Sequence, residues 1–239
     1  MQVGISAVLF DFDGLIIDSE TPLFDIWTAI YAEHGHTLTL DAWQHALGTQ
    51  GGFDPFTDLV ERTDAACDPA VLAARVTREH WRTCAAEPLQ PGILERLADA
   101  RSLGMRTAVA SSSSAKWVRA WLSQHDLLDR FDAVCTRDDV LRVKPAPDLF
   151  LLAAARLGVS PGACLVLEDS PNGIRAAHAA GMRVVAVPRG LTRTLPLPDP
   201  DLVVESLADL SLSRILEILE LGAAPQTKSD SSHPATPTN

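Results

Sequence analysis

The sequence predicts an α/β protein whose core is a doubly wound parallel β-sheet, with a helical insertion after the first strand. Short apolar runs without polar alternation recur along the chain, which is typical of strands buried on both faces. Segments with helical periodicity lie between most of these runs, and such alternation favours a parallel sheet covered by helices. Residues 18–88 break the alternation, because helical patterns follow one another there without a strand between them.

The predicted strands share a continuous apolar character and a strand-like length. They are residues 5–10 (ISAVLF), 105–110 (MRTAVA), 131–135 (FDAVC), 163–168 (ACLVLE), 183–188 (RVVAVP) and 201–205 (DLVVE). The helices predicted around them are residues 93–104, 114–128, 147–158 and 171–181. Several of these helical patterns have proline near their start and glycine just past their end, the usual asymmetry of helix termini.

Four consecutive helical patterns fill the insertion. They are residues 21–35, 40–48, 54–63 and 68–87. We interpret residues 18–88 as a helical cap domain inserted into a discontinuous core domain, which consists of residues 1–17 and 89–222. Residues 223–239 are rich in proline, serine and threonine with few apolar residues, which predicts a disordered tail.

Composition and charge narrow the classes of protein. The 239 residues are 46% hydrophobic and 21% charged, as in a soluble globular protein. No apolar run reaches the roughly 18 residues of a membrane span, and no basic segment leads into an apolar one at the N-terminus, so we expect a cytoplasmic protein. The net charge of −11 disfavours nucleic acid and anionic membranes as partners.

The cysteines match no metal-binding spacing and are predicted to be small buried thiols in a reducing compartment. They are Cys67, Cys84, Cys135 and Cys164.

Polar side chains follow several predicted strands at the edge where ligands bind in open parallel sheets. They are Asp11 and Asp13, Ser111 and Ser112, Lys144, and Glu168 and Asp169. Each alone is more typical of a turn, a helix cap or a solvated charge, and Ser114 is predicted to cap the helix that follows it. Together, however, the carboxylates would repel one another strongly unless a divalent cation and a lysine neutralised them.

These side chains suit phosphoryl transfer. A carboxylate can act as the nucleophile and form an aspartyl phosphate. Mg²⁺ prefers a few carboxylate oxygens, which suits Asp11 and Asp169 with Glu168 nearby and the backbone carbonyl of Asp13.

The phosphate oxygens need donors of their own. Lys144, the Ser111 hydroxyl and the Ser112 backbone amide are expected to hold them. The proline after Lys144 favours an extended backbone at that lysine, which helps to aim its side chain.

Four motifs in this order and spacing resemble those of the haloacid dehalogenase (HAD) superfamily, in its branch of β-phosphoglucomutase-like sugar phosphatases. They are DFDGLIIDSE (11–20), AVASSSS (108–114), RVKPAPDLF (142–150) and VLEDSPNGIRAAHAAGM (166–182). The resemblance covers the chain from about residue 3 to 210. It implies a Rossmann-like core, a small helical cap of the C1 type inserted after the first motif, and Mg²⁺ as cofactor.

The resemblance also implies roles for the motif residues. These are Asp11 as nucleophile, Asp13 as general acid/base, Ser111 and Lys144 as phosphate binders, Glu168 and Asp169 as metal ligands, and Asn172 as a less direct aid to the phosphate. Asp13 lies two residues from the nucleophile, so it can protonate the leaving oxygen and later accept a proton from the attacking water. A dehalogenase needs neither this partner nor a metal, so phosphate esters are the expected substrates.

The charge of the cap distinguishes a phosphatase from a phosphomutase, which would hold a second phosphate there. Residues 47–56, where the resemblance places a phosphate-binding arginine, contain Gln50 and three glycines but no arginine or lysine. Residues 18–88 hold twelve Asp+Glu, four Arg and no Lys. We therefore favour hydrolysis of a small sugar or polyol phosphate. A phosphomutase remains an alternative, since Arg78 and Arg82 could point inward, and a non-catalytic phosphoacceptor module is an alternative from another class.

Contacts that set specificity are harder to predict. Glu20, Gly51 and Gly52 are candidates from their place in the cap, whereas Trp27 is more typical of the cap's own core. The cap histidines have no ligand spacing and are expected at the surface or at helix ends: His34, His36, His45 and His80. The partner is expected to be a small phosphorylated metabolite, bound by a monomer or weak homo-oligomer.

Overall fold

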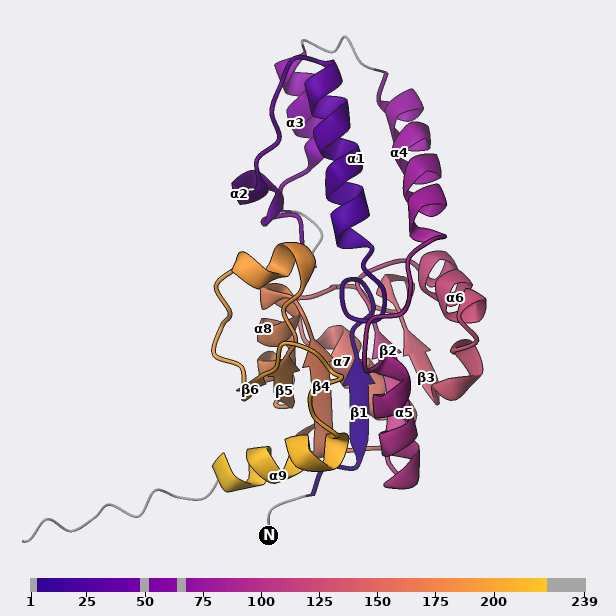
Figure 1. The fold of residues 1–239 in the computed structure, drawn as a ribbon, viewed down its shortest axis with the longest axis vertical. Helices are drawn as coiled ribbons and strands as arrows, with labels where there is room; N and C mark the ends of the chain where they lie inside the picture. Colours follow the sequence, from indigo (N-terminus) through magenta and orange to yellow (C-terminus); the bar gives the residue numbers. More distant parts are fainter. Residues whose placement is uncertain (1–3, 48–51, 64–67, 223–239) are drawn as a thin grey trace, which may run out of the picture.

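The computed structural model describes residues 4–47, 52–63 and 68–222. Within these ranges, six parallel strands form one sheet in the order β3-β2-β1-β4-β5-β6, with helices on both faces (Figure 1). The strands are β1 (Ala7–Phe10), β2 (Arg106–Ala110), β3 (Ala133–Cys135), β4 (Cys164–Glu168), β5 (Arg183–Ala186) and β6 (Leu202–Val203). Each lies inside the apolar run that predicts it, so the predicted fold class is confirmed.

Alternate residues of each strand face opposite layers of helices, because successive side chains in a strand point to opposite faces. Val8 and Phe10 of β1 pack with α5 (Ile93–Ser102), α6 (Ala115–Gln124) and α9 (Leu212–Gly222). Ala7 and Leu9 pack with α7 (Asp148–Leu157) and α8 (Pro171–Ala179) on the other face. Both faces of the central strands are therefore buried, which explains their apolar sequences.

Helices α1 (Glu20–Glu33), α2 (Leu40–Trp43), α3 (Pro55–Arg62) and α4 (Pro69–Cys84) stand beyond the carboxyl end of β1 (Figure 1). They enclose a separate apolar cluster that includes Trp27, Tyr31 and Leu59. The predicted helix over residues 40–48 is too long. After Trp43 the bonds shorten to three-residue spacing, as from the Ala46 amide to the Trp43 carbonyl at 2.8 Å, and the α-helix ends.

The two chain segments that join these helices to the sheet lie side by side. Ile17 and Leu89 form an antiparallel bridge. The backbone amide of Gln90 donates to the carbonyl of Ile16 at 2.9 Å. The chain thus leaves the sheet and returns to it at one place.

Helix α9 was not predicted from the sequence. Its Leu212, Ile215 and Leu219 are buried against the same face of the sheet as α5. The Ser211 hydroxyl accepts from the Arg214 amide at 3.3 Å in its first turn, and the carboxylate of Asp99 on α5 accepts from the Leu212 amide at 2.8 Å. Arg96, also on α5, donates to the carbonyls of Leu207 and Leu210 just before α9.

In the part of the chain that the structure describes, no helix combines the length and apolar character needed to cross a membrane. Cys84, Cys135 and Cys164 are buried and free, as predicted, and Cys67 lies outside the described residues.

We expect Asp99→Ala to destabilise the protein by about 1–2 kcal/mol, because it removes the acceptor of the Leu212 amide at the start of α9 and a partner of Arg96. The measurement is the free energy of unfolding in urea. Glu95→Ala, an exposed carboxylate on the same helix, is the control and should change it by less than about 0.5 kcal/mol. Equal effects of the two substitutions would contradict the capping role.

Candidate active site

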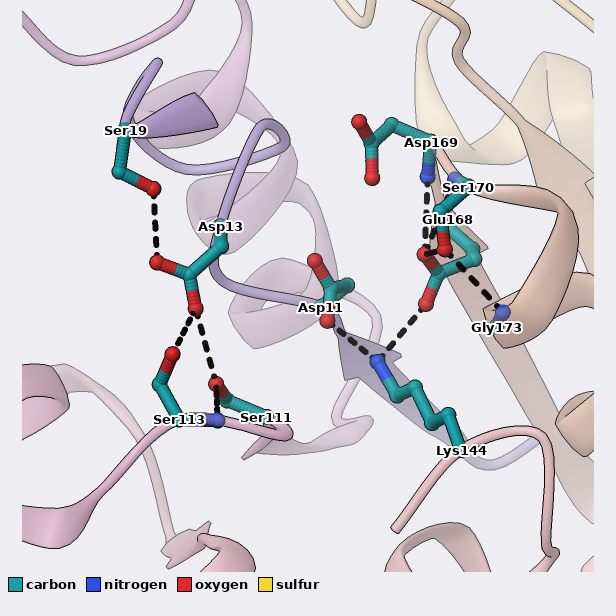
Figure 2. A network of polar contacts seen from close by, with 10 residues as sticks. All are labelled: Asp11, Asp13, Ser19, Ser111, Ser113, Lys144, Glu168, Asp169, Ser170 and Gly173. Carbon is teal, nitrogen blue, oxygen red and sulfur yellow. Dashed lines mark hydrogen bonds and ion pairs between the residues drawn. The ribbon is translucent and has the colours of Figure 1, made fainter. Parts of the chain in front are cut away.

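Asp11 lies just past the end of β1, where its amide still bonds to the Leu167 carbonyl of β4 at 3.0 Å. Its carboxylate contacts the ammonium of Lys144, which reaches it from the loop after β3 (Figure 2). The same ammonium lies 2.8 Å from Glu168 Oε2. Only 1% of Lys144 is exposed, so its charge is balanced by these two carboxylates and not by water.

Glu168 and Asp169 end β4, the strand paired with β1, and this pairing brings them beside Asp11. The second oxygen of Glu168 accepts from the Asp169 and Ser170 amides and from the Ser170 hydroxyl, at 3.2, 3.1 and 2.8 Å. Gly173 packs against this carboxylate so closely that a Cβ there would lie 1.9 Å from Glu168 Cδ. The residues that follow β4 therefore fix the position of the Glu168 carboxylate.

Asp11, Glu168 and Asp169 each offer an oxygen within 4.8 Å of the others. Burial raises the pKa of Asp11 to about 8, and the charge of Glu168 adds to this while Lys144 opposes it. Burial, followed by the charges of Glu168 and Asp11, also raises the pKa of Asp169 well above its usual range. Three crowded carboxylates with one lysine are short of positive charge, and their hard oxygen donors fit Mg²⁺.

Asp13 points away from this group, and its carboxylate accepts four hydrogen bonds, of which Figure 2 draws those from Ser19, Ser111 and Ser113. Ser19 Oγ and Trp117 Nε1 donate to Oδ1 at 2.7 and 2.9 Å. Ser111 Oγ and Ser113 Oγ donate to Oδ2 at 3.1 and 2.7 Å. Its predicted contribution to the metal, through the backbone carbonyl, remains a prediction.

Three of these donors were not singled out from the sequence. Ser113 belongs to the serine run and Ser19 to the first motif, so their place in the motifs was an available signal. Trp117 lies inside α6, and no local pattern indicates that its indole would reach Asp13. Thr192, whose hydroxyl donates to Asp169 at 3.2 Å, comes from a loop after β5 and had no signal either.

The predicted phosphate binders take different positions. Ser111 is buried and bonds to Asp13, whereas Ser112 lines the cavity above Asp11. The amide of Asn172 donates to the Leu47 carbonyl at 2.9 Å, so in this structure Asn172 joins α8 to the segment after α2. Lys144 touches the predicted nucleophile directly.

A cavity of about 600 Å³ opens above Asp11 between the sheet and helices α1–α4. Glu20 and Gly52 line it, as expected of specificity residues, and Gly51 and Gln50 lie outside the described residues. Burial, with the charges of Asp13, Asp11 and Asp18, raises the pKa of Glu20 to about 8. Most of the residues that α1–α4 and their connections contribute to the lining are apolar, among them Leu23, Trp27, Trp43, Leu47, Phe53 and Phe56, and Asp54 and Thr77 also line the cavity. Trp27 is also core, as predicted, because only 2% of it is exposed.

Positive charge is scarce around this cavity. Arg78 and Arg82 are exposed, and neither they nor Arg62 and Arg75 line the cavity. Among the described lining residues, Arg137 is the single arginine or lysine, and it comes from the segment after β3.

The prediction for His80 is wrong. It lies inside α4, partly buried, and stacks on Trp117 with ring centroids 4.5 Å apart. Its Nε2 donates to the Ser19 carbonyl at 2.8 Å, and burial lowers its pKa. The prediction failed because the aromatic residue that covers His80 lies on α6, far away in the sequence. His34, by contrast, does end α1.

Residues 5–181 match the haloacid dehalogenase-like hydrolase family, and the chain belongs to this family. Among its relatives is "Putative phosphatase YhcW" of Bacillus subtilis (strain 168), 42% identical over 90% of this chain and 98% of that protein. Hexitol phosphatase B of Escherichia coli (strain K12) is 34% identical over 90% of this chain and 94% of its own. Crystalline CbbY from Rhodobacter sphaeroides, in complex with phosphate, has a TM-score of 0.72 and 30% identity, covering 87% of this chain and 98% of that one. These matches confirm the predicted family, its sugar-phosphatase branch and the enzyme class, a phosphoric monoester hydrolase.

We expect Gly173→Ala to reduce phosphatase activity and to destabilise the protein by about 1–3 kcal/mol, because the added methyl group overlaps the Glu168 carboxylate. Urea unfolding and initial rates measure the two effects. Gly162→Ala is the control, since a Cβ there meets no heavy atom within 4 Å. A Gly173→Ala protein as stable and active as the control would show that Glu168 can move freely.

Proposed function

We propose that the protein is a Mg²⁺-dependent phosphatase that hydrolyses a small sugar or polyol phosphate through an aspartyl phosphate on Asp11. The observation that carries this proposal is the buried Asp11 carboxylate, which contacts Lys144, lies within 4.8 Å of Glu168 and Asp169, and opens to a cavity of about 600 Å³.

Asp11, Asp169 and the backbone carbonyl of Asp13 would hold the cation, with Glu168 beside it. When bound, Mg²⁺ supplies positive charge that offsets the carboxylates and the phosphate oxygens. The raised pKa values of Asp11 and Asp169 support this assignment, because both carboxyl groups are buried and lie beside other carboxylates, whose charge a cation would offset.

Each of the protein side chains then has its own role in the reaction. An oxygen of Asp11 attacks phosphorus while Asp13 gives a proton to the leaving oxygen, and the P–O bond to the alcohol breaks. A water next attacks the aspartyl phosphate, Asp13 takes its proton, and inorganic phosphate leaves with the Asp11 carboxylate restored. Lys144 keeps the attacking carboxylate oriented, and in this proposal the Ser111 hydroxyl, once turned from Asp13, and the Ser112 amide hold phosphate oxygens.

The leaving group is proposed to be uncharged, because most of the lining residues from 18–88 are apolar and no described arginine of that range is among them. Apolar and aromatic walls suit the C–H faces of a sugar or polyol. Hexitol phosphatase B, named above, is consistent with such a substrate. The same lack of cations disfavours a phosphomutase, which would convert β-glucose 1-phosphate to an isomer without releasing phosphate. Turnover with Mg²⁺ would exclude a non-catalytic phosphoacceptor.

The division into a core (1–17 and 89–222) and a cap (18–88), a cytoplasmic location, and a monomeric or weakly associating state belong to the same proposal. Gel filtration tests the oligomeric state. Limited proteolysis at the cap boundaries tests the division into core and cap.

Asp11→Asn should abolish hydrolysis of p-nitrophenyl phosphate, because the amide is a poor nucleophile and a poor cation ligand. Circular dichroism should show an intact fold. EDTA should likewise stop the wild-type enzyme, and added Mg²⁺ should restore it. Hydrolysis by Asp11→Asn at the wild-type rate would contradict the proposed mechanism.

Asp13→Asn should slow turnover by about 10² to 10⁴, because the amide can neither give nor take the proton. With p-nitrophenyl phosphate, whose leaving group needs little acid, the phosphorylated enzyme should accumulate and be visible by intact-mass spectrometry after acid quenching. Asp25→Asn, an exposed site on α1, is the control. Unchanged turnover by Asp13→Asn would show that another group transfers the proton.

A further inference from the structure

Among the four donors to Asp13, Trp117 differs in kind from the others. Ser19, Ser111 and Ser113 offer hydroxyls, which rotate and can accept as well as donate. The indole N–H of Trp117 can only donate, and it meets Asp13 Oδ1 at 2.9 Å. It is therefore the one donor of the four that cannot reverse its direction.

The indole is also held in place by its surroundings. Trp117 is 9% exposed, and its backbone amide bonds to the Ser114 hydroxyl at the start of α6. On one side His80 stacks on the ring at 4.5 Å with an interplanar angle of 24°. Trp81 and Trp121 meet it edge to face at 4.8 and 5.3 Å. His80 is fixed in turn by its bond to the Ser19 carbonyl.

We propose that Trp117 is a positioning residue for the proton transfer: it anchors Asp13 Oδ1, braced by His80, and leaves Oδ2 as the oxygen that exchanges the proton with the substrate. This inference rests on the proposed function. The oxygen that accepts from a fixed N–H is the less available of the two for proton exchange, whereas the hydroxyls on Oδ2 can turn away. Oδ2 also lies on the side of Ser111, where the phosphate is expected.

Proton donation matters most when the leaving oxygen is basic, and this gives a readout that a structural defect would not produce. The two probes are phenyl phosphate, with a basic leaving group, and p-nitrophenyl phosphate, with a weakly basic one. Trp117→Phe keeps a ring in the cluster and removes the N–H. It should lower kcat/KM for phenyl phosphate about tenfold more than for p-nitrophenyl phosphate, with Mg²⁺ present.

Trp121→Phe is the matched control. Trp121 lies on the same helix and in the same aromatic cluster, but it does not contact Asp13, and its own indole N–H is buried without a partner among the described residues. It should leave the ratio of the two kcat/KM values unchanged. His80→Ala should change this ratio in the same direction as Trp117→Phe, by a smaller factor. Thermal unfolding of each variant verifies that it is folded.

Three outcomes would overturn the inference: equal losses on both substrates in Trp117→Phe, the same selective loss in Trp121→Phe, or an unchanged ratio in His80→Ala, which would remove the bracing role. These results differ from failure of the proposed function itself, in which the wild-type enzyme with Mg²⁺ would hydrolyse neither probe.

Discussion

The site depends on one electrostatic constraint: three carboxylates and one ammonium are buried side by side at the paired ends of β1 and β4. Burying a charge is costly unless hydrogen bonds or opposite charges stabilise it, so neighbouring residues must supply these interactions. Lys144 spans Asp11 and Glu168, and Ser170 with two amides completes Glu168. The remaining deficit of positive charge is what the proposed cation would offset.

Glycine makes this crowding sterically possible. Gly14 has φ +89°, a conformation that other residues rarely adopt, and a Cβ there would lie 2.3 Å from Asp169 Oδ2. The turn after Asp13 can therefore run directly against the end of β4. The two glycines act in different ways: Gly14 of the first motif leaves room for Asp169 of the fourth, whereas Gly173 leaves room for Glu168 within the fourth motif itself.

The meeting of Asp11, Lys144, Glu168 and Asp169 could be predicted because parallel strands bring their carboxyl ends to one edge, whatever the details of packing. The strands themselves were predictable from apolar runs, since both sheet faces are covered. What failed depends on contacts distant in sequence. Helix α9 takes one of its N-terminal acceptors from Asp99 on α5, and His80 is covered by Trp117 of α6. Local patterns carry no information about such partners.

The bridge between Ile17 and Leu89 has a bearing on how this architecture diversifies. A segment whose two ends already touch adds little closure entropy when its length changes. Helices α1–α4 could therefore be exchanged for another insertion without moving β1 or the residues at its tip. In evolution, and in protein engineering, such a junction allows new substrate preferences to be grafted onto unchanged chemistry.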